Sequence, residues 1–432
     1  MLSPQRKFRA AAAIGLGLLA MNAFAAAHCD ADNGGITLPQ GFCAQVVADG
    51  LGAARHAVVA PNGDLYVAIM SDRNDKGGVV ALRDSHGDGK FDLKERFGEL
   101  SSTGIALRNG YLYVATVNSV IRYKMTAGQL KPSGAPEVVV SDLPGVRQHG
   151  DKGIAFDGKG WLYVNVGSPS NACQQPDRRT HVAGQDPCPL LEKHGGIWKF
   201  DENKLGQKQD DGVRWATGLR QEPAITWHDG KLYIVMNSRD QLDVFWPEHF
   251  TAKDNAERPA EPMYRVDKQD ENFGWPYCFY DYPAQKIVLN PEYGGDGSKV
   301  GRCSEMSLPV ASYPAHWAPV DVMFYSGSQF PAKYRSGAFI AFHGSWNRAP
   351  MPQDGYNVTF QPFKGENPSG KFEIYASGFA GKDPLMNPND AMARADGVAQ
   401  APDGSIYITD SQKGKIWHVA YESHGSTERR QR

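Results

Sequence analysis

The chain has 432 residues, and its 46 lysines and arginines nearly balance 48 aspartates and glutamates, which leaves a formal net charge of −2. This balance argues against a nucleic-acid partner, because proteins that bind nucleic acids carry a basic patch or stripe. The 47 glycines, 28 prolines and 11% aromatic residues are typical of a β protein with many turns.

The first 27 residues have the order of a secretory signal peptide. Basic residues precede the apolar run 10–20, and small residues follow it at 23–27. The run is shorter than the ~20 apolar residues of a membrane helix, and no later segment is apolar enough, so we expect no membrane span. The mature chain is expected to be soluble and periplasmic or secreted.

Six cysteines occur in the sequence. An even number in an exported protein favours disulfides, and sequence neighbours are close enough to pair locally. The predicted pairs are Cys29–Cys43, Cys173–Cys188 and Cys278–Cys303. Neither CxxC nor CxxCH occurs, which argues against a zinc ribbon or an attached c-type haem.

A short pattern recurs along the chain: an apolar strand, a turn with glycine, and a strand that opens with an aliphatic and an aromatic residue. Asn-Gly and Asp-Gly in the turns supply the positive φ angles that tight hairpins need. Five clear copies lie at residues 58–67, 105–114, 154–164, 225–234 and 398–408, and a degenerate copy spans 320–342.

Six copies spaced by roughly fifty to seventy residues indicate radial repetition, most simply a six-bladed β-propeller. We predict an all-β fold in which residues 28–420 form one catalytic domain and residues 421–432 a disordered tail. Long loop insertions are expected at 168–195 and 241–318, and two of the predicted disulfides fall within them. A pair of β-sandwiches is the alternative, but no linker divides the chain.

Residues 84–95 have the spacing of an EF-hand calcium loop, with three aspartates, a central glycine and a final glutamate. His86 occupies the third position, where it is a poor calcium ligand, and the flanking residues resemble strands rather than helices. We expect a glycine-rich hairpin turn here, with a bound calcium ion as the alternative.

Propellers bind ligands at the mouth of the central channel, so polar residues in the loops that enter the innermost strands matter most. His149 lies in such a loop, within the segment 147–157. Its unperturbed pKa lies near neutrality, which suits a general base. Four arginines are expected near the same face and suggest an anionic, planar ligand: Arg220, Arg239, Arg348 and Arg394.

Five strings of residues carry a family resemblance. They are Leu-Pro-Gln-Gly-Phe at 38–42, Gly-Ser-Pro-Ser-Asn-Ala-Cys at 167–173, Asn-Phe-Gly-Trp-Pro-Tyr-Cys at 272–278, Ala-Phe-His-Gly-Ser-Trp-Asn-Arg at 341–348 and the closing Asp396-Gly397. With them the chain resembles the soluble pyrroloquinoline-quinone (PQQ)-dependent sugar dehydrogenases, in the sorbosone or aldose dehydrogenase branch. The resemblance implies a dehydrogenase that oxidises a sugar by hydride transfer to PQQ and passes the electrons to an external quinone or cytochrome.

The same resemblance implies roles for single residues. His149 would be the catalytic base that takes the sugar hydroxyl proton, and Arg220 would approach the reacting quinone carbonyl and stabilise its developing charge. The implied cofactor contacts are Arg220, Gln221, Asn237, His343, Arg348, Arg394 and Asp396. A calcium ion (Ca²⁺) is implied at Ser238 and Arg239, through their backbone carbonyls, and at Asp243.

The chain departs from the family pattern after Arg220, where it reads Gln221-Glu222-Pro223. A carboxylate at Glu222 would repel an anionic cofactor unless it points away or helps to bind calcium. Two other functions are alternatives. One is a calcium-dependent lactonase-type propeller, which needs a cluster of Glu, Asn and Asp side chains in the channel; the other is a non-catalytic propeller that binds sugar or protein.

Overall fold

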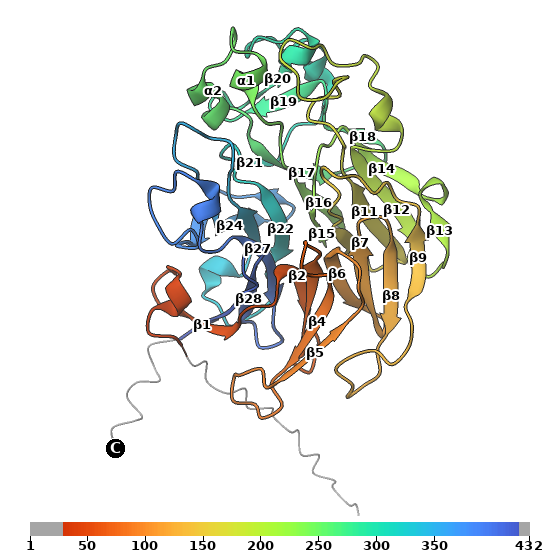
Figure 1. The fold of residues 1–432 in the computed structure, drawn as a ribbon, viewed down its shortest axis with the longest axis vertical. Coiled ribbons are helices and arrows are strands. Elements are labelled where there is room, and N and C mark those ends of the chain that lie inside the picture. The colour runs from red at the N-terminus through yellow and green to blue at the C-terminus, as the bar shows by residue number, and fades with distance from the viewer. Residues whose placement is uncertain (1–28, 423–432) are drawn as a thin grey trace, which may run out of the picture.

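The computed structural model describes residues 29–422. The predicted signal peptide, and residues 423–432 of the predicted tail, lie outside this range. Within it, six sheets of four or five strands surround a common axis (Figure 1).

One strand from each sheet lies innermost. These strands are β2 (Ala53–Val59), β6 (Ser102–Arg108), β10 (Ile154–Phe156), β15 (Ala224–His228), β22 (Pro319–Phe324) and β27 (Ala395–Gln400). Each contacts the next in chain order, and β27 contacts β2, so the ring is closed. The prediction of an all-β, six-bladed propeller is confirmed.

The remaining strands follow outward in each blade. In the first blade they are β3 (Leu65–Met70), β4 (Gly78–Arg83) and β5 (Leu93–Phe97). In the second blade they are β7 (Tyr111–Thr116), β8 (Val120–Lys124), β9 (Glu137–Ser141) and β13 (Gln207–Lys208). In the third blade they are β11 (Trp161–Val166), β12 (Gly196–Asp201), β14 (Val213–Thr217) and β18 (Glu271–Asn272). In the fourth blade they are β16 (Lys231–Val235), β17 (Glu261–Val266) and β21 (Ala311–Tyr313). In the fifth blade they are β23 (Gly337–His343), β24 (Tyr356–Lys364), β25 (Asn367–Pro368) and β26 (Glu373–Ala376). In the sixth blade they are β28 (Ile406–Asp410), β29 (Ile416–Tyr421) and β1 (Phe42–Ala48).

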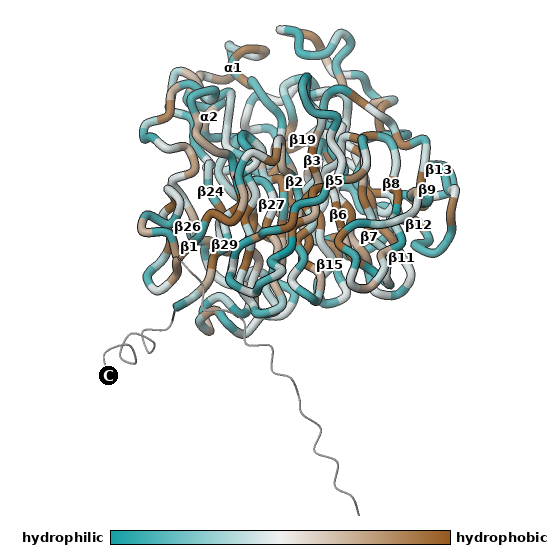
Figure 2. The backbone as a smooth tube through the Cα atoms, turned by 60° about the horizontal axis from the view of Figure 1, so that its bottom comes forward, coloured by the Kyte–Doolittle hydropathy of each residue, from teal (hydrophilic) through white to brown (hydrophobic). Residues whose placement is uncertain are grey.

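The repeated aliphatic–aromatic pair lies on the second strand of a blade because both faces of that strand are buried. Leu65 and Tyr66 on β3 are 0% and 2% exposed although they point to opposite faces of the sheet. Tyr66 packs in one buried cluster with Leu112 of the next blade, and Leu65 packs in another with Ile416 of the last blade. Apolar segments accordingly follow the strands in Figure 2, with hydrophilic loops around them.

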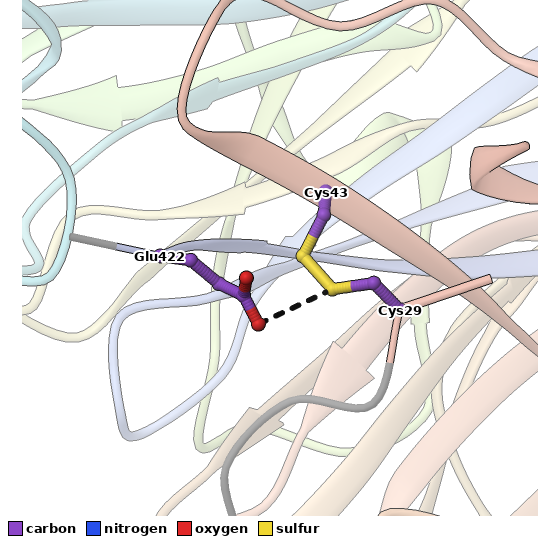
Figure 3. Close-up of side chains that lie close together, drawn as sticks. All are labelled: Cys29, Cys43 and Glu422. Atoms are coloured by element: carbon purple, nitrogen blue, oxygen red, sulfur yellow. Dashed lines mark hydrogen bonds between the residues drawn. A yellow bond between two sulfur atoms is a disulfide. The ribbon is translucent and has the colours of Figure 1, made fainter. Parts of the chain in front are cut away.

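The ring is closed by pairing between the two ends of the chain. β1 runs antiparallel to β29, with Phe42 opposite Tyr421, and thereby completes the sixth blade. Beside this joint, the disulfide Cys29–Cys43 lies next to Glu422, whose Oε1 is 3.6 Å from the Cys29 sulfur (Figure 3). The closure holds the blades at fixed angles around the channel.

The second long insertion carries the short helices and an extra hairpin, which lie together at the top of the molecule in Figure 1. These elements are α1 (Leu242–Phe245), α2 (Ala252–Glu257), β19 (Cys278–Asp281) and β20 (Lys286–Leu289). All three predicted disulfides are present, and no free cysteine occurs among residues 29–422. Within the same range, no helix has the length and apolar character needed to cross a membrane.

Single turns of 3₁₀-helix punctuate the loops. They are η1 (Asn33–Gly35), η2 (Pro189–Glu192), η3 (Gln209–Asp211), η4 (Pro291–Tyr293), η5 (Gly301–Glu305), η6 (Ala332–Tyr334) and η7 (Pro388–Asp390).

The segment 84–95 forms the connection from β4 to β5 and the start of β5. The Asp84 carboxylate accepts hydrogen bonds from the backbone N–H groups of Gly87 and Gly89, each at 2.7 Å. Strands flank the segment on both sides, as expected for a hairpin turn.

Blades three and four approach each other closely at Gly153, just before β10. A Cβ at this position would clash with the backbone oxygen of Pro223 and lie 2.6 Å from Ile225 Cγ2. We expect Gly153→Ala to lower the free energy of unfolding by about 2 kcal/mol or more, because the backbone has no room to yield. Gly134→Ala is the matched control, since a Cβ there would meet no atom within 4 Å beyond its chain neighbours. Equal denaturation midpoints for the two variants would contradict the prediction.

Candidate functional site

A pocket of about 180 Å³ lies where loops from several blades meet the insertions. It is lined by His149, Arg178, Arg220, Gln221, Asn237, Ser238, Asp240, Glu261, His316, Ala318, Trp346 and Asn347. Most of these residues stand just before an innermost strand or just after the second strand of a blade. The propeller therefore brings together polar side chains that are far apart in the chain.

His149 enters the pocket from the loop before β10, with a positive φ of 57°. Its Nδ1 lies 2.6 Å from the carbonyl oxygen of Ser168. Because a carbonyl only accepts hydrogen bonds, Nδ1 carries the proton and Nε2 is left as the basic nitrogen. Burial, followed by the charge of Arg220, lowers the pKa of His149 to about 3. The imidazole is therefore a neutral base at physiological pH.

Arg220 is the buried cation of the pocket, with 2% of its surface exposed. Its NH2 group donates to Asp240 Oδ2 at 2.6 Å and to Asn171 Oδ1 at 3.0 Å. Its Nε is buried and has no partner in the described residues. One N–H donor of the guanidinium is thus left without an acceptor in residues 29–422.

Asp240 connects several groups around the pocket. Its carboxylate also accepts from Arg178 NH2 at 2.9 Å and from Asn347 Nδ2 at 3.0 Å. Burial raises the pKa of Asp240, but Arg220 and Arg178 outweigh it and leave the pKa well below its usual range. Asp240 therefore remains an anion and sets the positions of both arginines.

A second carboxyl group lies in the wall of the pocket. Glu261 Oε2 accepts the backbone N–H of Ser238 at 2.7 Å, and Oε1 accepts that of Ala318 at 3.4 Å. Burial raises the pKa of Glu261 to about 8. Glu261 thereby joins the segment after β16 to the loop before β22.

Five of the residues predicted from the sequence line this pocket. They are His149, Arg220, Gln221, Asn237 and Ser238.

Three of the four arginines predicted to converge on one ligand contact other residues in this structure, and their shared ligand stays a prediction. Arg239 forms a buried ion pair with Glu292 of the insertion. Arg348 donates to the carbonyl oxygen of Ala256 at 2.6 Å. Each guanidinium donates to an acceptor that sequence spacing does not reveal.

Arg394 and His343 form their own contact outside the pocket lining. Arg394 NH1 lies 3.2 Å from His343 Nδ1, and Arg394 NH2 donates to the carbonyl oxygen of Pro388 at 3.0 Å. Asp243, predicted as a metal ligand, lies in the first turn of α1 and does not line the pocket either.

The central channel holds a separate group of buried charges. Asp396 on β27 pairs with Arg55 at 2.8 Å, and Arg55 also donates to Asp151 at 2.8 Å. Glu222 is fully buried and does not line the pocket, and burial raises its pKa to about 8, with Lys152 as the opposing charge. The repulsion predicted between Glu222 and an anionic ligand is therefore not a feature of the pocket.

Sequence reasoning missed the contributions of Arg178, Glu261 and His316. Arg178 lies in the first insertion, and Glu261 opens β17, so neither stands in a loop that enters an innermost strand. His316 does precede β22, and burial lowers its pKa to about 4. Three other lining residues did carry a signal: Asp240 follows the polar segment of Asn237 and Ser238, and Trp346 and Asn347 lie in the string 341–348.

The family model TrAA12-like matches residues 36–422. The chain belongs to this family.

Curated relatives are similar over part of their length. An uncharacterized protein of Borreliella burgdorferi is 27% identical over 278 residues, which cover 64% of this chain and 62% of the relative. The pyrroloquinoline quinone-dependent pyranose dehydrogenase of Coprinopsis cinerea is 27% identical over 261 residues, 53% of this chain and 34% of the relative. The chain thus spans less than two thirds of either relative.

Solved structures share the fold at low sequence identity. The PQQ domain of the Coprinopsis cinerea pyranose dehydrogenase, in its holo form, has a TM-score of 0.70 at 17% identity, over 89% of this chain and 97% of that domain. The calcium structure of the Trichoderma reesei family AA12 enzyme has a TM-score of 0.71 at 18% identity, over 90% and 97% of the two chains. The PQQ-bound aldose sugar dehydrogenase of Streptomyces coelicolor has 0.54 at 17%, over 89% and 99%. These likenesses establish a common fold.

The low pKa of His149 predicts its titration behaviour. Between pH 5 and 8 the imidazole should stay neutral, because its pKa is lowered to about 3. It should gain a proton on Nε2, and so become charged and lose its basic nitrogen, only when the pH falls toward this pKa. Arg220→Met should move the His149 pKa upward, because it removes a nearby positive charge. Histidine NMR titrations of the protein and this variant measure both effects. A His149 midpoint near the ordinary 6.5 would contradict the prediction.

The charge of Asp240 should be essential for stability. Asp240→Asn leaves two arginines short of their counter-ion, and we expect a loss of about 3–5 kcal/mol in the free energy of unfolding. Asp186→Asn is the control, since it breaks an exposed pair with Arg302 whose side chains are 44% and 43% exposed; its effect should stay below about 1 kcal/mol. Similar denaturation midpoints for both variants would refute the role assigned to Asp240.

Proposed function

We propose that this protein is an oxidoreductase that binds PQQ and oxidises a sugar. One observation carries the proposal: the pocket holds a neutral histidine, His149, with a free Nε2 beside the buried cation Arg220. A base and a fixed positive charge in one pocket suit removal of a hydroxyl proton while negative charge develops on an acceptor. The similarity to a pyranose dehydrogenase and an aldose sugar dehydrogenase supports the same reaction.

The polar atoms of the pocket fit a planar, anionic quinone. Arg220 Nε, a donor, and Asn347 Oδ1, an acceptor, are both buried and have no hydrogen-bond partner in residues 29–422. Arg178 and Gln221 add further donors in the lining, and guanidinium groups pair well with carboxylate and carbonyl oxygens. PQQ, when bound, supplies the electron sink that accepts a hydride. Of the seven contacts predicted from the sequence, only the three that line the pocket enter this proposal: Arg220, Gln221 and Asn237.

The pocket also offers oxygen atoms to a calcium ion. The carboxyl groups of Asp240 and Glu261 lie in its lining together with Ser238, and a hard cation prefers such oxygen ligands. Polarisation of a carbonyl as a Lewis acid is the chemistry that calcium supplies in such a site. The backbone carbonyls of Ser238 and Arg239 stay a prediction.

The chain's own residues would carry the proton chemistry. His149 Nε2 takes the proton of the sugar hydroxyl, and the carbonyl oxygen of Ser168 holds the Nδ1 proton throughout, which stabilises the imidazolium that forms. Asp240 keeps Arg220 charged and in place. Trp346, 51% exposed in the lining, leaves an aromatic surface for the sugar at the mouth.

The finer assignments follow the resemblance described above. An aldose or sorbosone-like sugar is the proposed substrate, and an external quinone or cytochrome is the proposed electron acceptor. Three disulfides within residues 29–422 agree with a periplasmic or secreted protein.

A calcium-dependent lactonase is a second candidate. The pocket combines two carboxyl groups, Asp240 and Glu261, with the amides of Asn237 and Asn347. This is the kind of Glu, Asn and Asp cluster that such a propeller needs for its ion. The two candidates differ in whether PQQ is required.

Reconstitution separates these functions. We expect the purified protein with PQQ and calcium to show a shifted quinone absorbance and to reduce a dye when aldoses are added. His149→Gln should bind PQQ but lower kcat by about 10²–10⁴-fold, because it removes the base. His86→Gln is the control, since His86 is exposed on the 84–95 turn.

Three outcomes would count against this proposal. An unchanged PQQ spectrum would overturn it, and calcium-dependent lactone hydrolysis without PQQ would favour the lactonase. Sugar binding without dye reduction or hydrolysis would indicate a non-catalytic propeller.

A further inference from the structure

The first insertion reaches the pocket as a loop whose residues 173–188 are closed by the disulfide Cys173–Cys188; we call residues 168–188, which include the five residues before this ring, the closed loop. Gly167 leads into it and passes directly against His149: a Cβ here would clash with the His149 backbone oxygen and lie 2.9 Å from the His149 Cβ. The next residue, Ser168, donates its N–H to the Arg220 carbonyl at 2.8 Å and accepts from His149 Nδ1 at 2.6 Å. The closed loop thus touches both the base and the cation of the pocket.

Asn171, three residues further on, is fully buried. Its Oδ1 accepts from Arg220 NH2 at 3.0 Å and from the backbone N–H of Asp240 at 2.9 Å. Its Nδ2 donates to the carbonyl oxygen of Asp240 at 3.1 Å. One carboxamide therefore joins the guanidinium of Arg220 to the backbone of the residue that supplies its counter-ion.

The closed loop holds Asn171 itself in place. The backbone N–H of Asn171 donates to Asp177 Oδ1 at 3.0 Å, and its carbonyl oxygen accepts from Trp275 Nε1 at 2.9 Å. Cys173 and Cys188 pack against Trp275 in a small buried cluster. The side chain of Asn171 consequently has a fixed direction.

Arg220 has few other contacts that would fix its orientation. Its Nε has no partner in residues 29–422, and its NH1 reaches only the carbonyl oxygen of Asn237 at 3.5 Å. Without Asn171, the NH2 group would keep Asp240 as its single close acceptor. A guanidinium held at one point can turn about that contact, whereas two acceptors on one nitrogen define its plane.

We propose that Asn171 is a positioning residue that sets the orientation of Arg220 in the pocket and thereby the placement of charge beside His149. The significance of this orientation for turnover rests on the proposed function. The contacts of Asn171 in the structure do not depend on the proposed function. The disulfide then serves the site by bracing the segment directly after this carboxamide.

Two substitutions at one position test the proposal. Asn171→Leu keeps a similar volume but removes the acceptor, and Asn171→Asp keeps an oxygen for Arg220. Gln185→Ala is the matched control, because Gln185 is an exposed amide in the same closed loop. If Asn171→Leu does not fold, Asn171→Ala replaces it.

We expect Asn171→Leu to lower kcat by about 10–100-fold, as misplacement of a reacting group does, with a much smaller change in KM. Asn171→Asp should recover at least about fivefold of that loss, and Gln185→Ala should match the unaltered protein. Equal losses in the leucine and aspartate variants would overturn the proposal.

A crystal structure of each variant supplies a readout that needs no turnover. The Arg220 guanidinium should leave its plane in the leucine variant, and in the aspartate variant it should keep this plane and its contact with residue 171. An unmoved Arg220 in the leucine variant would refute the positioning role. If the unaltered protein reduces no dye with any sugar, the proposed function fails, while these structures still decide the role of Asn171.

Discussion

A ring of sheets holds together only when its last blade is joined to its first, and here β1 makes the joint by pairing with β29. Because the ring is closed, the loops that precede the innermost strands all point toward one axis. His149, Arg220 and His316 belong to three different blades and yet line the same pocket. The site is thus a consequence of closure, and no single blade contains it.

Within that frame, the pocket obeys the rule that buried charges need partners. Asp240 pairs with Arg220 and Arg178, and the amides of Asn171 and Asn347 complete the network. Much of this network comes from the insertions, which have little regular structure and are held by disulfides. The propeller therefore positions His149, and loops held by disulfides bring charged and amide side chains around it.

Local sequence was sufficient for the blades. The aliphatic–aromatic pair at Leu65 and Tyr66 signals a strand that is buried on both faces, and the glycine turns before such pairs define hairpins. Cysteines that are near neighbours in sequence were also enough to predict all three disulfides. His149 could be recognised because a polar loop before a repeat strand must open toward the channel.

The direction of a polar side chain could not be predicted from local sequence, because it depends on acceptors that come from distant segments. Arg348 and Arg394 look like anion ligands in the sequence but are occupied by backbone carbonyls, and Glu222 does not line the pocket. Arg178 carries no motif and still reaches Asp240. The sequence by itself thus determined the repeat, the cross-links and the place of His149 in the pocket, since these depend on short-range patterns. Only the tertiary structure decided which charges meet, because burial and long-range hydrogen bonds select each partner.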